Sequence, residues 1–309
     1  MKPHAQFPRE QSADGNFKRQ EDAFRDWVRA DGSSRYPATP NRYHLYVCYA
    51  CPWAHRIIIT RRLKGLQDVM GMTAVDPWRD DRGWRFREGN GFSVDPINRF
   101  QYLSEAYLAS DSNYRGRWTV PVLWDKQQGR IVSNSDDDLI RMLNTEFNAF
   151  AGEPNLDLYP AAHRAEIDRL NEIIYQKINN GVYQAGFATT QSAYESAVKP
   201  LFATLDALED HLSRRRFLVG ETLTETDIRL FVTLVRFDAV YVGHFKCNLR
   251  RIADYPHLSA FLRLVNAQPG VADTVRIDQI KTHYYATHTE INPTGIVPLG
   301  PELDFASTD

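Results

Sequence analysis

The chain has 309 residues, of which 43% are hydrophobic, so it is long enough to bury two hydrophobic cores. Its net charge of -2, with basic and acidic residues interspersed, gives no reason to expect a nucleic-acid partner. No apolar run approaches the roughly 18 residues of a membrane-spanning helix, the first residues do not resemble a signal peptide, and three cysteines are too few for a disulfide scaffold. We therefore expect a cytoplasmic protein with no membrane partner.

The first predicted elements form a β-α-β unit behind a polar arm. Residues 1–42 are rich in Gly, Pro, Ser and Arg, and we interpret them as an extended N-terminal arm. Aromatic and aliphatic side chains alternate over 43–49, which predicts a strand. Pro52 suits the first turn of a helix and Gly65 suits its C-terminal end. A second strand is expected over 69–75.

A long segment, residues 76–117, separates this unit from the next strands. It is polar and aromatic and too long for an ordinary connection, so a functional role is favoured over an idle loop. Two strands are predicted at 119–124 and 130–132, followed by a helix over 136–147. Pro121 lies inside the first of these patterns, where proline is tolerated only at a sheet edge or a special turn.

The second half of the chain is almost entirely helical in pattern. A linker is expected at 152–156, and helices are expected over about 161–181, 191–214, 225–243 and 256–267. Thr224 to Asp227 resembles a capping box before the third of these helices. The tail from Ile277 is too irregular to be helical throughout. The predicted domains are an arm (1–42), an α/β domain (43–150), an all-helical domain (151–276) and a C-terminal extension (277–309).

One cysteine stands where a strand gives way to a helix, at the start of the stretch C-P-W-A. At that position the helix dipole and the first backbone N–H groups stabilise a thiolate, which lowers the pKa of a thiol from about 8.5 into the range of roughly 3.5–7.5. His55 and Arg56 add positive charge further along the helix. We therefore interpret Cys51 as a reactive nucleophile, against the alternative of an inert buried cysteine.

Cys48 and Cys51 also form a C-x-x-C pair, which suggests a dithiol or half of a metal site. In a thioredoxin-like pair the first cysteine opens the helix, whereas here the second one does. A zinc site would need a second pair of ligands, and Cys247 stands alone. A single working cysteine with no metal is therefore favoured over a dithiol or a metal site.

Six blocks of the sequence occur in an order that is typical of one protein family. The first, C-P-W-A-H-R at 51–56, is moderately specific by itself. The others are Trp84, T-V-P-V-L-W-D at 119–125, I-R-M-L-N at 140–144, N-G-V-Y-Q-A-G-F at 180–187, and H-Y-Y at 283–285 followed by 291–301. Together they resemble the glutathionyl-hydroquinone reductases, the Xi class of the glutathione transferases, over most of the chain.

The resemblance implies a thioredoxin-like α/β N-terminal domain and an all-α C-terminal domain, the glutathione transferase architecture, in a homodimer. It implies an enzyme with glutathione as co-substrate and an aromatic hydroquinone as product. By this analogy Cys51 attacks the sulfur of a glutathionyl-hydroquinone and retains glutathione as a mixed disulfide, which a second thiol then resolves. Ala54 suits this cycle, because a second cysteine there could compete with the external thiol.

The resemblance also implies which residues bind the two halves of the substrate. Trp84 would line the glutathione pocket, and the backbone of Val120, before a cis Pro121, would pair with the cysteinyl unit of glutathione. Tyr183 and Tyr284 would hold the hydroquinone through a ring face and a phenol hydroxyl. Without the resemblance, ordinary packing would be the first interpretation of each of these aromatic side chains.

One pair of residues departs from the family pattern. Ser135 and Asp136 stand where the family has Glu-Ser to bind the γ-glutamyl end of glutathione. The carboxylate of Asp136 would repel the carboxylate of that group unless a cation intervened. Three interpretations stay open: Ser135 binds the carboxylate, Asp136 only caps the following helix, or the thiol is another low-molecular-weight thiol such as mycothiol or bacillithiol.

Two further functions fit the same fold. One is a non-catalytic protein that binds a ligand or partner, because a fold does not determine a function. The other is conventional conjugation of glutathione to electrophiles, which ordinarily activates the thiol of glutathione through Ser or Tyr. The intact C-P-W-A stretch and the two tyrosines favour a cysteine-dependent thiol transferase over both.

Overall fold

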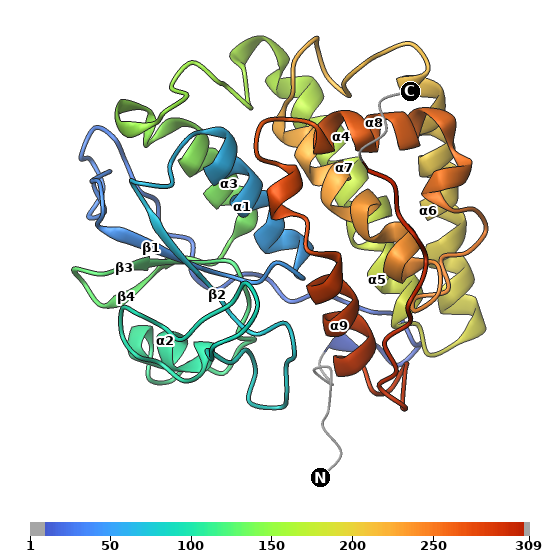
Figure 1. The fold of residues 1–309 in the computed structure, drawn as a ribbon, viewed down its shortest axis with the longest axis horizontal. Coiled ribbons are helices and arrows are strands. Elements are labelled where there is room, and N and C mark those ends of the chain that lie inside the picture. Colours follow the sequence, from blue (N-terminus) through green and yellow to red (C-terminus); the bar gives the residue numbers. More distant parts are fainter. Residues whose placement is uncertain (1–9, 306–309) are drawn as a thin grey trace. The chain divides into compact units, whose positions relative to one another are not determined.

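The computed structural model describes residues 10–305 and divides the chain into two compact units. Of the described residues, the first unit contains 20–157 and the second contains 10–19 and 158–305. The arm predicted over 1–42 is therefore divided between the two units, because residues 10–19 belong to the helical unit and residues 20–42 belong to the first unit. Figure 1 shows the helices and strands of both units.

A four-stranded mixed sheet forms the centre of the first unit, in the order β2-β1-β3-β4. β1 runs parallel to β2 and antiparallel to β3, and Leu45 of β1 lies opposite Met72 and Leu123. β3 runs antiparallel to β4. Every residue of β1 is buried, as expected for a strand covered on both faces. The strands are β1 (Tyr43–Val47), β2 (Gly71–Ala74), β3 (Val122–Asp125) and β4 (Arg130–Ser133).

Helices cover both faces of this sheet (Figure 1). α1 (Pro52–Leu63) and α3 (Asp136–Thr145) pack against each other, and α2 (Leu103–Ser110) packs against β4. α2 lies inside the segment 76–117, for which the sequence suggested no helix. Its buried residues are only Leu103, Ala106 and Tyr107, which make a helical apolar period too short to stand out in a polar segment.

Pro121 stands just before β3, which begins at Val122. The peptide bond between Val120 and Pro121 is cis, as the family resemblance implies. β3 is paired on both sides, so a proline inside it would have removed a ladder hydrogen bond. The proline is tolerated because it lies outside the strand.

The second unit is built from helices around a buried α7 (Glu225–Arg236), all of whose residues are buried. Thr224 and Asp227 form the predicted capping box at its start, where the N–H of Thr224 donates to the carboxylate of Asp227 at 2.7 Å. The other helices are α4 (Arg164–Ile174), α5 (Gly181–Gly186), α6 (Gln191–Leu212), α8 (Pro256–Asn266) and α9 (Ile277–Thr287). Within residues 10–305, no helix is both long and apolar enough to cross a membrane.

Two of the helices that the sequence predicts are interrupted by π-helical turns. η4 (Tyr175–Asn179) separates α4 from α5, and η5 (Phe237–Tyr241) follows α7. The side-chain amide of Asn179 donates to the carbonyl oxygen of Arg229 at 2.9 Å, which ties η4 to α7. Such turns are rare and frequently occur at functional sites. The tail is helical only at its start, where α9 buries Ile280, and it is irregular from His288 to residue 305, so it is not helical throughout, as expected.

Candidate functional site

Segments that carry predicted site residues meet at one edge of the sheet in the first unit. β1 is parallel to β2 and, through the antiparallel β3, also parallel to β4. The C-terminal ends of these three strands and the N-terminal end of β3 therefore share one edge. Cys51 follows β1, Pro121 precedes β3, and Ser135 follows β4.

Cys51 is the N-cap residue of α1, and Pro52 occupies the first helical position, as the sequence predicts. The Sγ atom of Cys51 lies 3.5 Å from the backbone carbonyl oxygen of Val120, within the range of a thiol hydrogen bond. The side chain of Cys51 is partly exposed. The thiol is therefore accessible and lies at the N-terminal end of a helix, where the helix dipole favours a thiolate.

The other two cysteines are placed for packing. Cys48 lies just past the end of β1 and is completely buried, as is Cys247. Burial raises the pKa of the Cys247 thiol, so this thiol stays protonated. None of the three cysteines forms a disulfide bond. Among the described residues, no group of three or more His, Cys, Asp or Glu side chains is placed to hold a metal ion.

Ser135 and Asp136 occupy the start of α3. The hydroxyl of Ser135, the N-cap residue, accepts a hydrogen bond from the N–H of Asp138 at 3.3 Å. Asp136 is the first helical residue, and its Oδ2 lies 2.6 Å from Nη1 of Arg56. The interpretation that Asp136 only caps this helix is therefore wrong, because Ser135 provides the cap and Asp136 forms an ion pair.

Arg56 is the cation that intervenes beside Asp136. It is completely buried, its Nη1 also lies 3.5 Å from Oδ1 of Asp137, and its guanidinium lies 4.6 Å from the ring centroid of Trp53. A buried guanidinium requires an acidic partner, because an unpaired charge in the protein interior is very costly. The charge of Asp136 thus balances a charge that α1 brings into the core.

Trp84 is buried in the loop that follows β2. The N–H of Leu103 donates to the carbonyl oxygen of Trp84 at 2.9 Å, and the N–H of Asp76 donates to that of Arg85 at 2.9 Å. The second bond holds this loop close to the end of β2. The role of Trp84 in thiol binding stays a prediction.

Tyr183 and Tyr284 meet in the second unit, although 101 residues separate them in the chain. Their hydroxyl oxygens lie 2.5 Å apart. The hydroxyl of Tyr241 lies 3.0 Å from that of Tyr284. We call these three residues, which come from α5, η5 and α9, the tyrosine trio. Tyr241 and Tyr284 are buried, whereas Tyr183 is partly exposed, so Tyr183 is the member that solvent reaches.

The tyrosine trio is an uncharged set of hydroxyls. Burial above all, and then the neighbouring Tyr183, raises the pKa of Tyr241 and of Tyr284 well above the usual value for a phenol. Both residues are therefore neutral near pH 7. A neutral phenol hydroxyl both donates and accepts a hydrogen bond, which suits the binding of an oxygen on an aromatic ring.

Two residues beside this site were missed by the sequence analysis. Tyr241 ends the π-helical turn η5, and its sequence pattern does not separate it from an ordinary core tyrosine. Arg19, in the arm, lies with its guanidinium carbon 4.8 Å from the ring centroid of Tyr183. The π-helical turn that carries Tyr241 is visible only in the structure, because such a turn leaves no periodic signal in the sequence.

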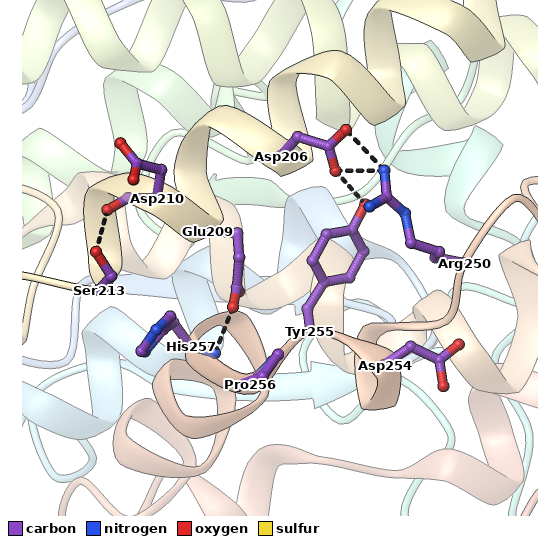
Figure 2. A pocket seen from close by; sticks show the side chains of 9 residues that line it. All are labelled: Asp206, Glu209, Asp210, Ser213, Arg250, Asp254, Tyr255, Pro256 and His257. Carbon is purple, nitrogen blue, oxygen red and sulfur yellow. Dashed lines mark hydrogen bonds and ion pairs between the residues drawn. The ribbon is translucent and has the colours of Figure 1, made fainter.

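A groove of about 460 Å³ lies on the second unit between α6 and the start of α8 (Figure 2). Two of its acidic side chains, Asp206 and Glu209, are engaged in hydrogen bonds within the unit. Asp206 binds the guanidinium of Arg250 at 2.6 Å and the hydroxyl of Tyr255 at 2.8 Å, and Glu209 accepts the N–H of His257 at 2.8 Å. None of the residues that line this groove is a predicted site residue.

Two family models match the chain, each to one part of the fold. The model described as glutathione S-transferase, N-terminal domain, matches residues 50–146, and the model of the C-terminal domain matches residues 191–264. The chain is 50% identical to glutathionyl-hydroquinone reductase PcpF of Sphingobium chlorophenolicum, over 94% of this chain and 91% of that protein. It is 48% identical to glutathionyl-hydroquinone reductase YqjG of Escherichia coli, over 95% and 92%.

Solved structures agree with these matches. The glutathione S-transferase Xi of Phanerochaete chrysosporium superposes with a TM-score of 0.92 at 50% identity and covers 94% of each chain. The glutathione-bound structure of YqjG from Escherichia coli gives a TM-score of 0.89 at 48% identity, over 92% of this chain and 94% of that one. The predicted fold, a thioredoxin-like N-terminal domain followed by an all-α C-terminal domain, is therefore confirmed. The chain belongs to the glutathionyl-hydroquinone reductases, the Xi class of the glutathione transferases.

Proposed function

We propose that this protein is a cysteine-dependent thiol transferase and reductase that removes glutathione from glutathionyl-hydroquinones through a mixed disulfide at Cys51. Relatives that are named glutathionyl-hydroquinone reductases support the reaction. The observation that carries the assignment to Cys51 is its place: a partly exposed thiol at the N-terminus of α1. Cys48 and Cys247 are buried and do not offer such a thiol.

In the first half-reaction the thiolate of Cys51 attacks the glutathione sulfur of the conjugate. An S–S bond forms, the bond between that sulfur and the ring carbon breaks, and the ring carbon takes up a proton. The two sulfurs are oxidised to a disulfide while the ring carbon is reduced, and the hydroquinone leaves. The positive end of the α1 dipole favours the attacking thiolate over the thiol.

In the second half-reaction an external thiol restores the enzyme. The thiolate of a second glutathione attacks the mixed disulfide, takes over the bound glutathionyl group as oxidised glutathione, and leaves Cys51 as a thiolate. This step requires that no internal cysteine attacks first. The complete burial of Cys48 and the alanine at position 54 are consistent with that requirement.

We propose glutathione as the co-substrate, which the glutathione-bound structure of the Escherichia coli relative supports. The acidic start of α3 is less repulsive to the γ-glutamyl carboxylate than its sequence suggests. Asp136 is paired with Arg56 at 2.6 Å, and Asp138 is paired with Arg25 at 2.7 Å. Ser135 and the N-terminus of α3 would then receive the γ-glutamyl end, while Val120 and Trp84 would take the remainder of the molecule.

The aromatic half of the conjugate is assigned to the second unit. Tyr183 and Tyr284 would hold the hydroquinone oxygens through their hydroxyls, which lie 2.5 Å apart. Because Tyr183 is partly exposed, a ligand can reach its hydroxyl. We further propose that the enzyme acts as a homodimer, and sedimentation equilibrium should then give about twice the chain mass of 35.6 kDa.

Intact-mass analysis after incubation with oxidised thiols tests both the reaction and the co-substrate. Oxidised glutathione should add one glutathionyl group to the wild-type protein and to Cys48→Ala, the matched control, but none to Cys51→Ala. Oxidised mycothiol and bacillithiol are assayed in parallel. An adduct on Cys51→Ala would contradict the role of Cys51, and an adduct only with another thiol would contradict glutathione as co-substrate.

A further inference from the structure

The first described part of the N-terminal arm, residues 10–19, is an ordered part of the helical unit. The N–H of Lys18 donates to the carbonyl oxygen of Glu10 at 2.7 Å, which closes this segment into a turn. The side-chain amide of Gln11 donates to the carbonyl oxygen of Phe187 at 2.9 Å, which ties the turn to the end of α5. We call residues 10–19 the arm segment.

Gly15 allows the arm segment to approach the helices closely. Its φ is +88°, in the left-handed region that favours glycine, and its carbonyl oxygen accepts the N–H of Thr189 at 3.2 Å. A Cβ at this position would lie 2.8 Å from Oγ1 of Thr189 and 2.9 Å from Cγ2 of Thr190. Any other residue at position 15 would therefore push the arm segment away.

The arm segment brings a cation to the tyrosine trio. The guanidinium carbon of Arg19 lies 4.8 Å from the ring centroid of Tyr183 and 5.4 Å from that of Phe17, which is itself buried. Nε of Arg19 donates to Oδ1 of Asn180 at 2.8 Å. A long cationic side chain on a polar arm is ordinarily solvated, whereas this one is held in place by a hydrogen bond and two aromatic faces.

We propose that Arg19 is a positioning residue of the aromatic site, which holds the ring of Tyr183 and places a fixed positive charge beside it, so that the site prefers ionised phenols to neutral aromatic molecules of the same size. The proposal rests on the proposed function in taking a hydroquinone as the natural ligand. The preference itself is a binding property, and it is measured without the reaction.

The preference follows from the charges around the trio. A guanidinium stays charged at every physiological pH, and a nearby positive charge favours a negative oxygen. A hydroxyl that donates to a phenolate oxygen makes a charge-assisted hydrogen bond, which is stronger than one to a neutral oxygen. The neutral Tyr241 and Tyr284 place no negative charge against such a ligand.

Two titratable groups near the trio, Arg236 and His244, do not oppose this preference. The positive charge of Arg236 acts to lower the pKa of Tyr241 and of Tyr284, so it favours a negative oxygen at the trio. Burial lowers the pKa of His244 to about 4, which leaves that ring neutral at physiological pH. The rings of His244, His283 and His288 pack around Tyr284.

An ionised hydroquinone would also help the proposed reaction. In a ring with two para hydroxyls, the carbon bonded to sulfur is always next to a carbon that bears oxygen. Ionisation of that oxygen raises the electron density at the carbon that must take up a proton. A site that prefers the phenolate therefore prefers the form that releases sulfur more readily.

Binding of 4-nitrophenolate and of its neutral methyl ether, 4-nitroanisole, tests the proposal. We expect Arg19→Gln to weaken binding of the phenolate about tenfold and binding of the ether less than about twofold, in equilibrium dialysis above the pKa of the phenol. Lys18→Gln removes the neighbouring exposed charge and should change neither affinity. Arg19→Lys keeps the charge without the planar stack and should lie between wild type and Arg19→Gln.

Equal weakening of the two ligands by Arg19→Gln would overturn the proposal, because a residue that only anchors the arm would affect both alike. Equal affinity of the wild-type protein for the two ligands would also overturn it. Circular dichroism checks that each variant folds, and Arg19→Lys provides the comparison if Arg19→Gln does not fold.

A second pair of variants tests the arm segment itself. Gly15→Val should reproduce the selective loss of phenolate binding, because it displaces the segment that carries Arg19. Gly32→Val is the matched control, since Gly32 has a similar φ of +72° but no neighbouring atom within 4 Å of its Cβ position. Unchanged phenolate preference in Gly15→Val would contradict the role of the arm. Wild-type turnover by Cys51→Ala would end the proposed reaction without altering these binding ratios.

Discussion

The candidate site residues of the first unit lie at the ends of helices and strands, whereas those of the second unit are side chains that meet in a helical core. Cys51 caps α1, its thiol faces the carbonyl of Val120, and Ser135 caps α3. The tyrosine trio and Arg19 come from four segments of the second unit. A site made by backbone ends depends on local structure, and a site made by side chains depends on packing across the fold.

The two units can be followed separately in solution. All six tryptophans lie between positions 27 and 124, which belong to the first unit. Tryptophan fluorescence therefore reports the unfolding of the first unit. The far-UV circular dichroism signal is dominated by the helices of the second unit, so the pair of signals compares the units within one sample.

The largest contrast is expected between the functional groups themselves. Cys51→Ala should slow the release of hydroquinone from a glutathionyl-hydroquinone by at least about a thousandfold, because the nucleophile is lost. Tyr183→Phe keeps the ring and removes one hydroxyl, so we expect a loss of about tenfold. Chromatography of the released hydroquinone measures both rates. A loss in Tyr183→Phe as large as that in Cys51→Ala would show that the trio, too, supplies an indispensable group.

The next contrast concerns ion pairs. Arg56→Met leaves Asp136 without its cation in a site where only 14% of the Asp136 side chain is exposed, and should destabilise the first unit by about 3–5 kcal/mol. Urea unfolding followed by tryptophan fluorescence measures this cost. The matched change in the second unit is Lys199→Met, which removes an exposed pair with Glu195 and should leave the stability nearly unchanged. Similar costs for the two variants would contradict the role given to the buried pair.

Asp227 should make the stability of the second unit depend on pH. Burial raises the pKa of its carboxyl from 3.8 to about 6, so the folded state holds the proton more tightly than the unfolded state. The resulting stabilisation is fully present below pH 3.8 and is lost as the pH rises through about 6. The loss is on the order of 3 kcal/mol. It is measured as the difference in unfolding free energy between wild type and Asp227→Asn, which cannot ionise, in urea at several pH values.

The control in the first unit is His44, whose contribution to stability depends on pH in the opposite direction. Burial lowers the pKa of His44 from 6.5 to about 4, so its contribution to stability is lost as the pH falls through this range. Acidification should therefore stabilise the second unit through Asp227 and destabilise the first unit through His44. A difference between wild type and Asp227→Asn that does not change with pH would contradict the assignment to Asp227.

A small effect is expected from Tyr241→Phe. The variant keeps the buried ring and removes the hydroxyl that lies 3.0 Å from that of Tyr284. We expect a loss of about 1 kcal/mol in the stability of the second unit and little change at the first. Urea unfolding followed by both signals measures it. A large shift of the tryptophan signal would show that the two units do not unfold independently.

Much of the first unit could be predicted because its signals are local. Pro52 marks the first turn of a helix directly after Cys51, and the helix predicted over 136–147 begins at Asp136 and ends at Thr145 in the structure. The interruptions of the second unit could not be predicted in this way. A π-helical turn such as η4 inserts one residue without changing the apolar composition, so the pattern reads as one continuous helix.

The sequence by itself determined the helix that Cys51 caps and the division into an α/β part and a helical part, and it pointed to Cys51 as the nucleophile that we propose. Each of these depends on residues within a few positions of one another, where propensity, capping and periodicity act. Only the tertiary structure decided that Arg56 balances Asp136, that a third tyrosine joins Tyr183 and Tyr284, and that the arm brings Arg19 to Tyr183. These contacts span 43 to 164 residues, and no local pattern encodes which distant side chain will meet a buried charge or hydroxyl.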